Sequence, residues 1–157
     1  MAFRIIVDFK KPEEGIIQYP NKILRLRSKR VTKINENTRK IANKLIKILR
    51  KVDKFWNPWL GMASPQIGYN KRIIAIKESY HSYIIMINPE IIEQKWFLPI
   101  IGSCFSLKGL YLAKYHYWFK IKYQDLAGKY HTRTLIGLKA AVIQQEIDHL
   151  NGKLICD

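Results

Sequence analysis

Cysteine and long apolar runs are both scarce in this sequence. The two cysteines, Cys104 and Cys156, are too few for a disulfide framework and are typical of a reducing compartment. No apolar run approaches the ~20 residues that a membrane-spanning helix needs. The first ten residues also lack the apolar stretch and cleavage site of a secretory signal. These absences exclude a disulfide-stapled secreted domain and predict that the chain has no membrane span.

Acidic residues are the second shortage, with 12 Asp and Glu against 28 Lys and Arg, which leaves a formal net charge of +16. Residues 1–54 hold 16 basic and five acidic residues, so this third carries +11 of the excess. A field this positive favours a polyanionic partner. A bias toward lysine codons in an AT-rich genome is the alternative explanation, but such a bias also supplies Asp and Glu, which remain few.

The length and composition predict one folded domain. The chain has 157 residues, 48% of them apolar, and shows no internal repeat or polar low-complexity tract. Residues 1–157 are therefore interpreted as a single domain in which residues 1–35 form a basic, extended lead segment.

An amphipathic helix is predicted over residues 36–52. Ile41, Leu45 and Leu49 recur at helical spacing, and Asn35 or Asn37 is available as the N-cap. Basic residues of the lead segment and of this helix are the candidate phosphate contacts, although solvation is the commoner role of such a face. The candidates are Arg25, Arg27, Lys29, Arg30, Arg39, Lys40, Lys44, Lys47, Arg50 and Lys51.

The sequence of the rest of the chain predicts mainly strands, followed by a late helix. Residues 56–70 are predicted to form a loop rich in Pro and Gly. Strands are predicted at 72–77, 83–88, 118–124 and 129–135, with Pro89 closing the second strand and Gly128 in the hairpin turn. A helix from Leu138 is expected to stop before Asn151-Gly152. This order predicts an α+β fold of mostly antiparallel strands around a late helix.

The late helix carries the residues most suggestive of chemistry. Residues 144–152 read QQEIDHLNG. In metal hydrolase helices of the type H-E-x-x-H, two His four residues apart share one face and bind the metal, and the Glu between them acts as the base. Position 145 would be the first His, and it is Gln145. By themselves, Glu146 and His149 are a weak signal, because an exposed His on a helix is the commoner case.

Three ordered segments together raise the strength of that signal. They are WLGMASPQ at 59–66, GSCFS at 102–106 and IQQEIDHLNG at 143–152. In order and separation they resemble the motifs G-x-G-x-A-A-P-Q, E-G-C-L-S and Q-H-E-x-D-H-L of the peptide deformylase family, and the resemblance extends over residues 18–157. It implies an α+β deformylase fold, with antiparallel sheets around a central C-terminal motif helix and an N-terminal amphipathic helix.

The resemblance also implies a role for each matching residue. Members of the family remove the N-formyl group from the initiator Met of nascent chains, using Fe²⁺ or a similar divalent ion. By position, Cys104 and His149 would be metal ligands, with Gln145 in the third ligand position. Glu146 would be the general acid/base. The developing oxyanion would be bound by Gln66 and the Phe105 backbone N–H, near Gly61 of the first motif.

Several departures from the motifs predict a loss of catalysis. An amide oxygen is a hard, weak ligand compared with the imidazole that Gln145 replaces. Trp59 stands where the family has a Gly. In the second motif, Gly102 replaces the Glu and Ser103 replaces the Gly. Each change removes part of the working site.

Two hypotheses from different classes follow. The favoured one is a catalytically degenerate protein with no metal cofactor, a structural or accessory component of a mitochondrial ribosome in the matrix, in contact with rRNA and ribosomal proteins. The alternative is an active metal-dependent deformylase of the bacterial cytoplasm, using Fe²⁺ or Zn²⁺ on nascent formyl-Met peptides. A Trp59 side chain that fills the methionine pocket would argue against the enzyme.

Overall fold

The described part of the chain folds into a curved sheet, two α-helices and two short 3₁₀ helices. The computed structural model describes residues 3–5, 13–53 and 57–157. Within these ranges the helices are η1 (Lys22–Arg25), α1 (Glu36–Val52), η2 (Ser64–Ile67) and α2 (Gly137–Leu150). The strands are β1 (Phe3–Ile5), β2 (Gly61–Ala63), β3 (Ile73–Lys77), β4 (Tyr83–Gly102), β5 (Leu110–Gln124) and β6 (Tyr130–Ile136). No helix of the described residues is long and apolar enough to cross a membrane.

Helix α1 has the predicted bounds. Of the two candidate caps, the structure uses Asn35, whose Oδ1 accepts a hydrogen bond from the Thr38 backbone N–H at 3.1 Å. Ile41, Leu45 and Leu49 are buried in one apolar cluster with residues of β2 and β3, such as Met62 and Ile73, because their spacing places them on a single helix face.

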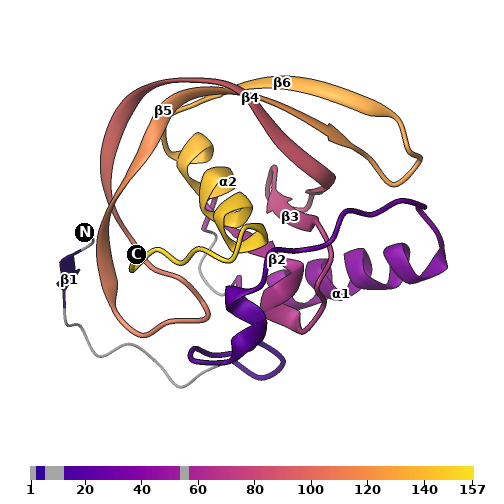
Figure 1. Ribbon diagram of the computed structural model, residues 1–157, viewed down its shortest axis with the longest axis horizontal. Coiled ribbons are helices and arrows are strands. Elements are labelled where there is room, and N and C mark those ends of the chain that lie inside the picture. The colour runs from indigo at the N-terminus through magenta and orange to yellow at the C-terminus, as the bar shows by residue number, and fades with distance from the viewer. Residues whose placement is uncertain (1–2, 6–12, 54–56) are drawn as a thin grey trace.

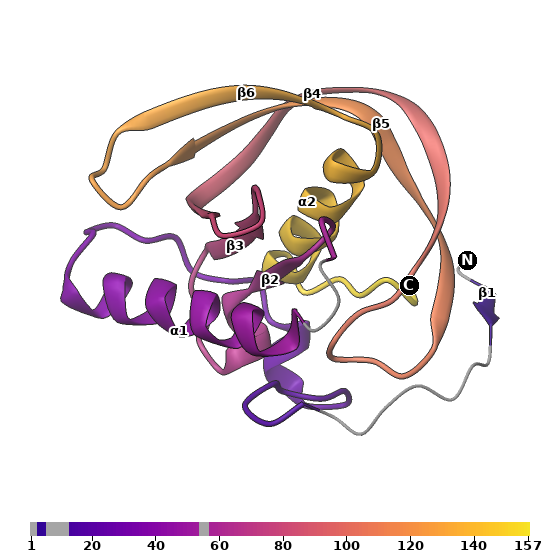
Figure 2. The same ribbon diagram turned by 180° about the vertical axis from the view of Figure 1, so that it is seen from behind.

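The sheet is antiparallel throughout, as predicted, but it is one continuous sheet rather than several. Its order is β1-β5-β4-β3-β2, and β6 pairs with β5 off this path. The long strands β4 and β5 bend around α2, which lies in the concave side of the sheet (Figures 1 and 2). The α+β class with a central late helix is therefore confirmed.

The prediction that Pro89 closes a strand is wrong. β4 continues from Tyr83 to Gly102, because a bulge absorbs the proline between Ile87 and Glu90. Asn88 turns with a φ of 52°, and its side chain binds the Val31 backbone N–H at 2.8 Å and the Val31 carbonyl at 2.9 Å. The side chain thus supplies hydrogen bonds where the ladder is interrupted.

Two predicted irregular segments contain regular structure. In the lead segment, residues 3–5 pair with β5, and η1 follows at Lys22–Arg25 with Leu24 fully buried; residues 1–2 and 6–12 lie outside the described residues. The predicted loop at 56–70 contains β2 and η2, both buried, while Trp56 lies outside the described residues. Each of these elements is only three or four residues long. A segment this short shows no periodicity in the sequence from which it could be predicted.

Candidate active site

Helix α2 brings Gln145, Glu146 and His149 to the concave side of the sheet, and its C-terminal end is held in place by other elements. The Leu150 carbonyl accepts hydrogen bonds from the Ser28 backbone N–H at 2.8 Å and from Arg72 Nη1 at 3.3 Å. Gly152 follows with a φ of +75°, and a Cβ there would lie 2.5 Å from the Arg25 carbonyl oxygen. The glycine therefore lets the chain approach the lead segment closely.

Cys104 and His149 lie side by side, although they are 45 residues apart. Cys104 Sγ is 3.2 Å from His149 Nε2, and both side chains are buried. Burial raises the pKa of the Cys104 thiol to about 12, with a further increase from the Glu146 charge, and burial lowers the pKa of His149 to about 4. Both groups are therefore neutral at pH 7 without a cation between them.

Glu146 is a buried carboxyl group next to this pair. Its residue is 4% exposed, and its Oε2 has no hydrogen-bond partner among the described residues. Burial, followed by the charge of Asp148, raises the pKa of Glu146 to about 8. The carboxyl group packs against Gly61, where a Cβ would lie 2.8 Å from Glu146 Cγ. Glycine at this position is what leaves room for the carboxyl group.

The two expected oxyanion donors come from η2 and from the loop that follows Cys104. Gln66 Oε1 accepts a hydrogen bond from the Ala63 N–H at 2.9 Å, which directs Gln66 Nε2 toward Cys104 Sγ at 3.6 Å and Ser106 Oγ at 3.2 Å. The Phe105 carbonyl accepts a hydrogen bond from Gln18 Nε2 at 2.9 Å, which ties this loop to the lead segment. The Gln66 amide N–H is thus held at the thiol.

These residues surround a pocket with a volume of about 330 Å³. Its wall is partly apolar, with Val52, Leu60, Leu107 and Val142, and partly polar, with Gln66, Gln145 and Glu146. Trp59 lines the pocket and is 45% exposed, and the pocket has this volume with the indole in place.

The residues fit a divalent metal ion only in part. Cys104 and His149 provide a sulfur and an unprotonated nitrogen that face each other, which suits Fe²⁺ or Zn²⁺. Gln145 Nε2 donates to the Ser103 carbonyl at 3.1 Å, so the amide oxygen is the atom left for a ligand role. Among the described residues, no group of three His, Cys, Asp or Glu side chains could hold a metal. The third donor would be the weak one.

Comparison with known proteins agrees with this arrangement. The model of the polypeptide deformylase family matches residues 13–157. The chain belongs to this family. A peptide deformylase of Prochlorococcus marinus (strain MIT 9312) is 35% identical over 153 residues, covering 94% of this chain and 74% of the relative. One from Dictyoglomus thermophilum is 37% identical over 136 residues, covering 86% and 85%.

Solved deformylase structures have the same fold. The peptide deformylase of Thermotoga maritima superposes with a TM-score of 0.81 at 32% identity, covering 89% of this chain and 92% of that one. The peptide deformylase of Legionella pneumophila gives a TM-score of 0.82 at 29% identity, covering 89% and 82%. The deformylase fold expected from the three motifs is therefore shown.

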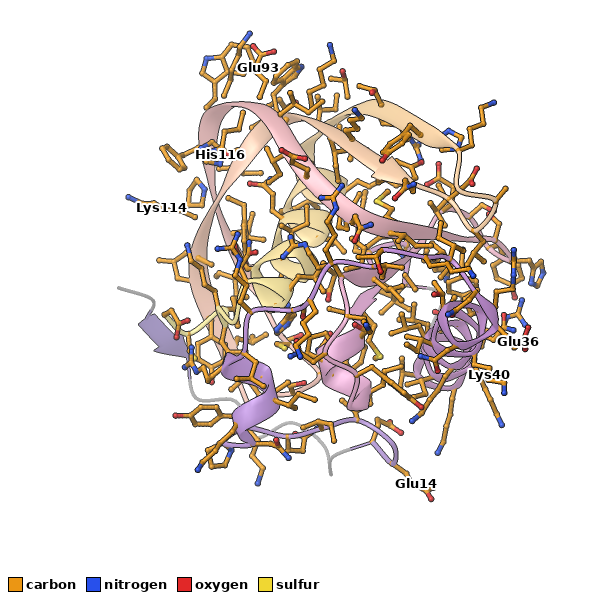
Figure 3. The ribbon with its side chains drawn as sticks, turned by 45° about the vertical axis from the view of Figure 1, so that its right-hand side comes forward. Glu14, Glu36, Lys40, Glu93, Lys114 and His116 are labelled. Carbon is orange, nitrogen blue, oxygen red and sulfur yellow. The ribbon has the colours of Figure 1, made fainter. Side chains whose placement is uncertain are left out.

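The ten candidate phosphate contacts come from the segment that runs from the end of η1 to Arg30 and from α1. Half of them have local partners. Arg25 forms an ion pair with Asp157 at 2.7 Å, and Lys51 forms one with Glu14. Lys44 and Arg50 lie over tyrosine rings, and the Lys29 backbone forms a β-bridge with Lys71. Arg39, Lys40 and Lys47 are exposed on α1, where Figure 3 shows Lys40 on the outer side of the helix. Arg27 and Arg30 remain, and they line a second pocket with Arg72.

Sequence reasoning missed the residues that position the site. Gln144 Nε2 donates to the His116 carbonyl at 2.7 Å, and Gln144 Oε1 accepts from the His116 N–H at 2.8 Å, which fixes α2 to β5. Gln18 and Arg72 have similar roles at the loop and at the helix end. Gln144 lies within a motif and could have been found from it, whereas Gln18 and Arg72 act over long sequence separations that leave no local pattern.

Proposed function

We propose that this chain is a working peptide deformylase, which hydrolyses the N-formyl group of formyl-methionyl peptides. The observation that carries the proposal is an open pocket lined by Cys104 and Glu146, with His149 Nε2 at 3.2 Å from Cys104 Sγ and an unpartnered Glu146 oxygen. The relatives reported above are described as peptide deformylases, which supports the same activity. The proposal reverses the preference for a degenerate scaffold that the substitution of Gln145 suggested.

The side chains divide the reaction between them. Water adds its oxygen to the formyl carbon, and the bond from that carbon to the amino nitrogen breaks, releasing formate and a free N-terminus. Glu146 takes the proton of the water and delivers it to the leaving amino nitrogen, and a pKa near 8 suits transfer in both directions. Gln66 Nε2 and the Phe105 N–H donate to the formyl oxygen as negative charge develops there. The apolar wall, with Leu60 and Val142, receives the methionine side chain.

A divalent ion such as Fe²⁺ or Zn²⁺ would be held by Cys104, His149 and the Gln145 amide oxygen. When bound, it would polarise the formyl group and lower the pKa of a water molecule. Cys104 and His149 are neutral and buried next to each other, so they need no rearrangement of charge beyond release of the thiol proton. The weak third ligand predicts low metal affinity rather than a missing site.

The scaffold hypothesis remains a prediction that rests on the motif departures at Trp59, Gly102, Ser103 and Gln145. Ribosome contact, rRNA binding and a mitochondrial location rest on the net charge of +16. A bacterial cytoplasm is the location that accompanies the enzyme, and we propose it on the basis of the bacterial relatives named above.

The decisive experiment is deformylation of a formyl-Met peptide by protein purified without oxygen and supplied with Fe²⁺, Ni²⁺ or Zn²⁺. Formate release is measured for the unaltered chain and for Glu146→Gln, which keeps the shape of the side chain but cannot carry the proton. Turnover that disappears in Glu146→Gln supports the proposal. Folded, metal-supplied protein with no turnover would overturn it and favour the scaffold.

A further inference from the structure

A second pocket lies on another side of α2 and shares no lining residue with the first. Its volume is about 530 Å³. It is formed by the segment after η1, the start of β3, the bulge of β4 and the end of α2, which Figure 1 shows close together. Its residues are Arg27, Ser28, Arg30, Arg72, Pro89, Glu90, Ile91, Ile147 and Asn151. The deformylation chemistry uses none of them.

Arginine dominates this pocket. Arg27 and Arg30 are exposed and form no ion pair with any described residue. Arg72 is half-buried, and burial, followed by the charges of Arg27 and Arg30, lowers its pKa, which shows that the three guanidinium groups act on one another. Glu90 is the one carboxylate among the lining residues, so the pocket keeps two positive charges in excess.

Arg72 is fixed in the wall of the pocket. Its Nη1 donates to Asn151 Oδ1 at 3.0 Å and to the Leu150 carbonyl at 3.3 Å, and its Nη2 donates to the Pro89 carbonyl at 3.4 Å. The Leu150 carbonyl, which would repel an anion at the C-terminal end of α2, is thereby bonded to cationic and N–H donors. These hydrogen bonds hold the guanidinium group rigid. Binding of a ligand therefore loses no further side-chain entropy at Arg72.

An unpartnered hydroxyl group is the second, independent feature. Ser28 is 5% exposed, and its Oγ has no hydrogen-bond partner among the described residues. A buried hydroxyl without a partner costs free energy, and a ligand oxygen in the pocket would supply the missing bond. The planar N–H forks of Arg27 and Arg30, together with a hydroxyl donor, match the tetrahedral oxygens of a phosphate group.

We infer that this pocket binds a phosphate group of an RNA backbone. RNA is favoured over a small phosphate compound because Arg27 and Arg30 lie in the open, next to Lys29 on the same exposed segment, and because the chain carries a net charge of +16. Isolated arginines that serve only solubility would have no reason to surround a cavity. The site leaves the catalytic pocket free, so RNA contact and deformylation are compatible.

The test compares two double variants that remove the same charge. Arg27→Gln with Arg30→Gln alters the pocket, while Arg39→Gln with Lys40→Gln alters exposed residues of α1; Arg72 is left unchanged because it anchors α2. Binding of a labelled RNA hairpin is followed by fluorescence anisotropy across a salt series from about 50 to about 200 mM. The pocket variant should lose about tenfold in affinity, and its salt slope should fall by about 1 to 2 units, whereas the α1 variant keeps most of both.

Each alternative outcome overturns the inference. Equal losses in the two variants would show a response to net charge alone. Binding of inorganic phosphate at the pocket without binding of RNA would show a small-anion site. No binding of RNA by the unaltered chain would remove the site altogether. Thermal unfolding checks that both variants fold, and their unchanged deformylation of a formyl-Met peptide separates this inference from the proposed function, on which it does not rest.

Discussion

At the scale of single residues, Gln145 is the position on which the function of this chain depends. Cys104, Glu146 and Gln66 line one pocket with Gln145, and His149 lies against Cys104. An imidazole nitrogen binds Fe²⁺ and Zn²⁺ far better than an amide oxygen does. The amide should therefore weaken the proposed metal site.

Gln145→His should raise the affinity for a divalent ion by at least about tenfold, since the change restores a nitrogen donor at a ligand position. Competition against a chromophoric chelator with Zn²⁺ or Co²⁺ measures this directly, without any assay of turnover. Gln145→Ala is the matched control and should bind more weakly than the unaltered chain. Equal affinities for all three proteins would show that position 145 does not reach the ion.

The motif residues could be predicted from the sequence, while the residues that hold them could not. The resemblance of three short segments to deformylase motifs implies that Cys104 and His149 lie together as ligands, and the 3.2 Å between Cys104 Sγ and His149 Nε2 agrees with that expectation. Gln18, which binds the loop that carries Phe105, is 87 residues away from its partner. Such a contact depends on the whole fold and leaves no local signature.

At the scale of elements, the two α-helices differ in how much of their structure could be predicted from the sequence. α1 lies on the surface, so its apolar face stands out at helical spacing, and both of its ends were predicted. α2 is buried on most of its sides by the sheet and by η2, whereas Leu138 in its first turn is exposed. A helix surrounded by protein has no contrast between its faces from which an orientation could be predicted.

The cap of α1 gives a matched pair of variants. Asn35→Ala removes the side-chain oxygen that accepts from the Thr38 N–H and should lower the free energy of unfolding by about 1 kcal/mol. Asn37 is exposed within the first turn, so Asn37→Ala should change stability by less than about 0.5 kcal/mol. Urea unfolding measures both. A larger loss of stability for Asn37→Ala than for Asn35→Ala would show that Asn37, and not Asn35, caps the helix.

At the scale of the whole molecule, ion pairs connect elements that are far apart in the sequence. Glu78 follows β3 and accepts hydrogen bonds from Arg133 of β6, at 2.9 Å, and from Lys139 of α2. With a net charge of +16, the chain repels itself, and each carboxylate that bridges elements offsets part of this repulsion. Acidification protonates such carboxylates and removes their charge, which should therefore loosen the packing of α2 against the sheet.

Glu78→Gln tests this connection through its dependence on pH. Burial alone would raise the pKa of Glu78, but the hydrogen bonds from Arg133 and Lys139 outweigh it and hold the pKa below the ordinary value of 4.5. A lowered folded-state pKa contributes stability that is present above 4.5 and is lost as the pH falls through the lower value. The unaltered chain should therefore exceed Glu78→Gln in urea midpoint at pH 7, and the difference should narrow as the pH falls through the lowered pKa.

Glu93→Gln, which breaks an exposed ion pair with Lys95, is the control and should show little difference across the same pH series. A gap for Glu78→Gln that does not narrow on acidification would mean that packing, and not ionisation, connects these elements.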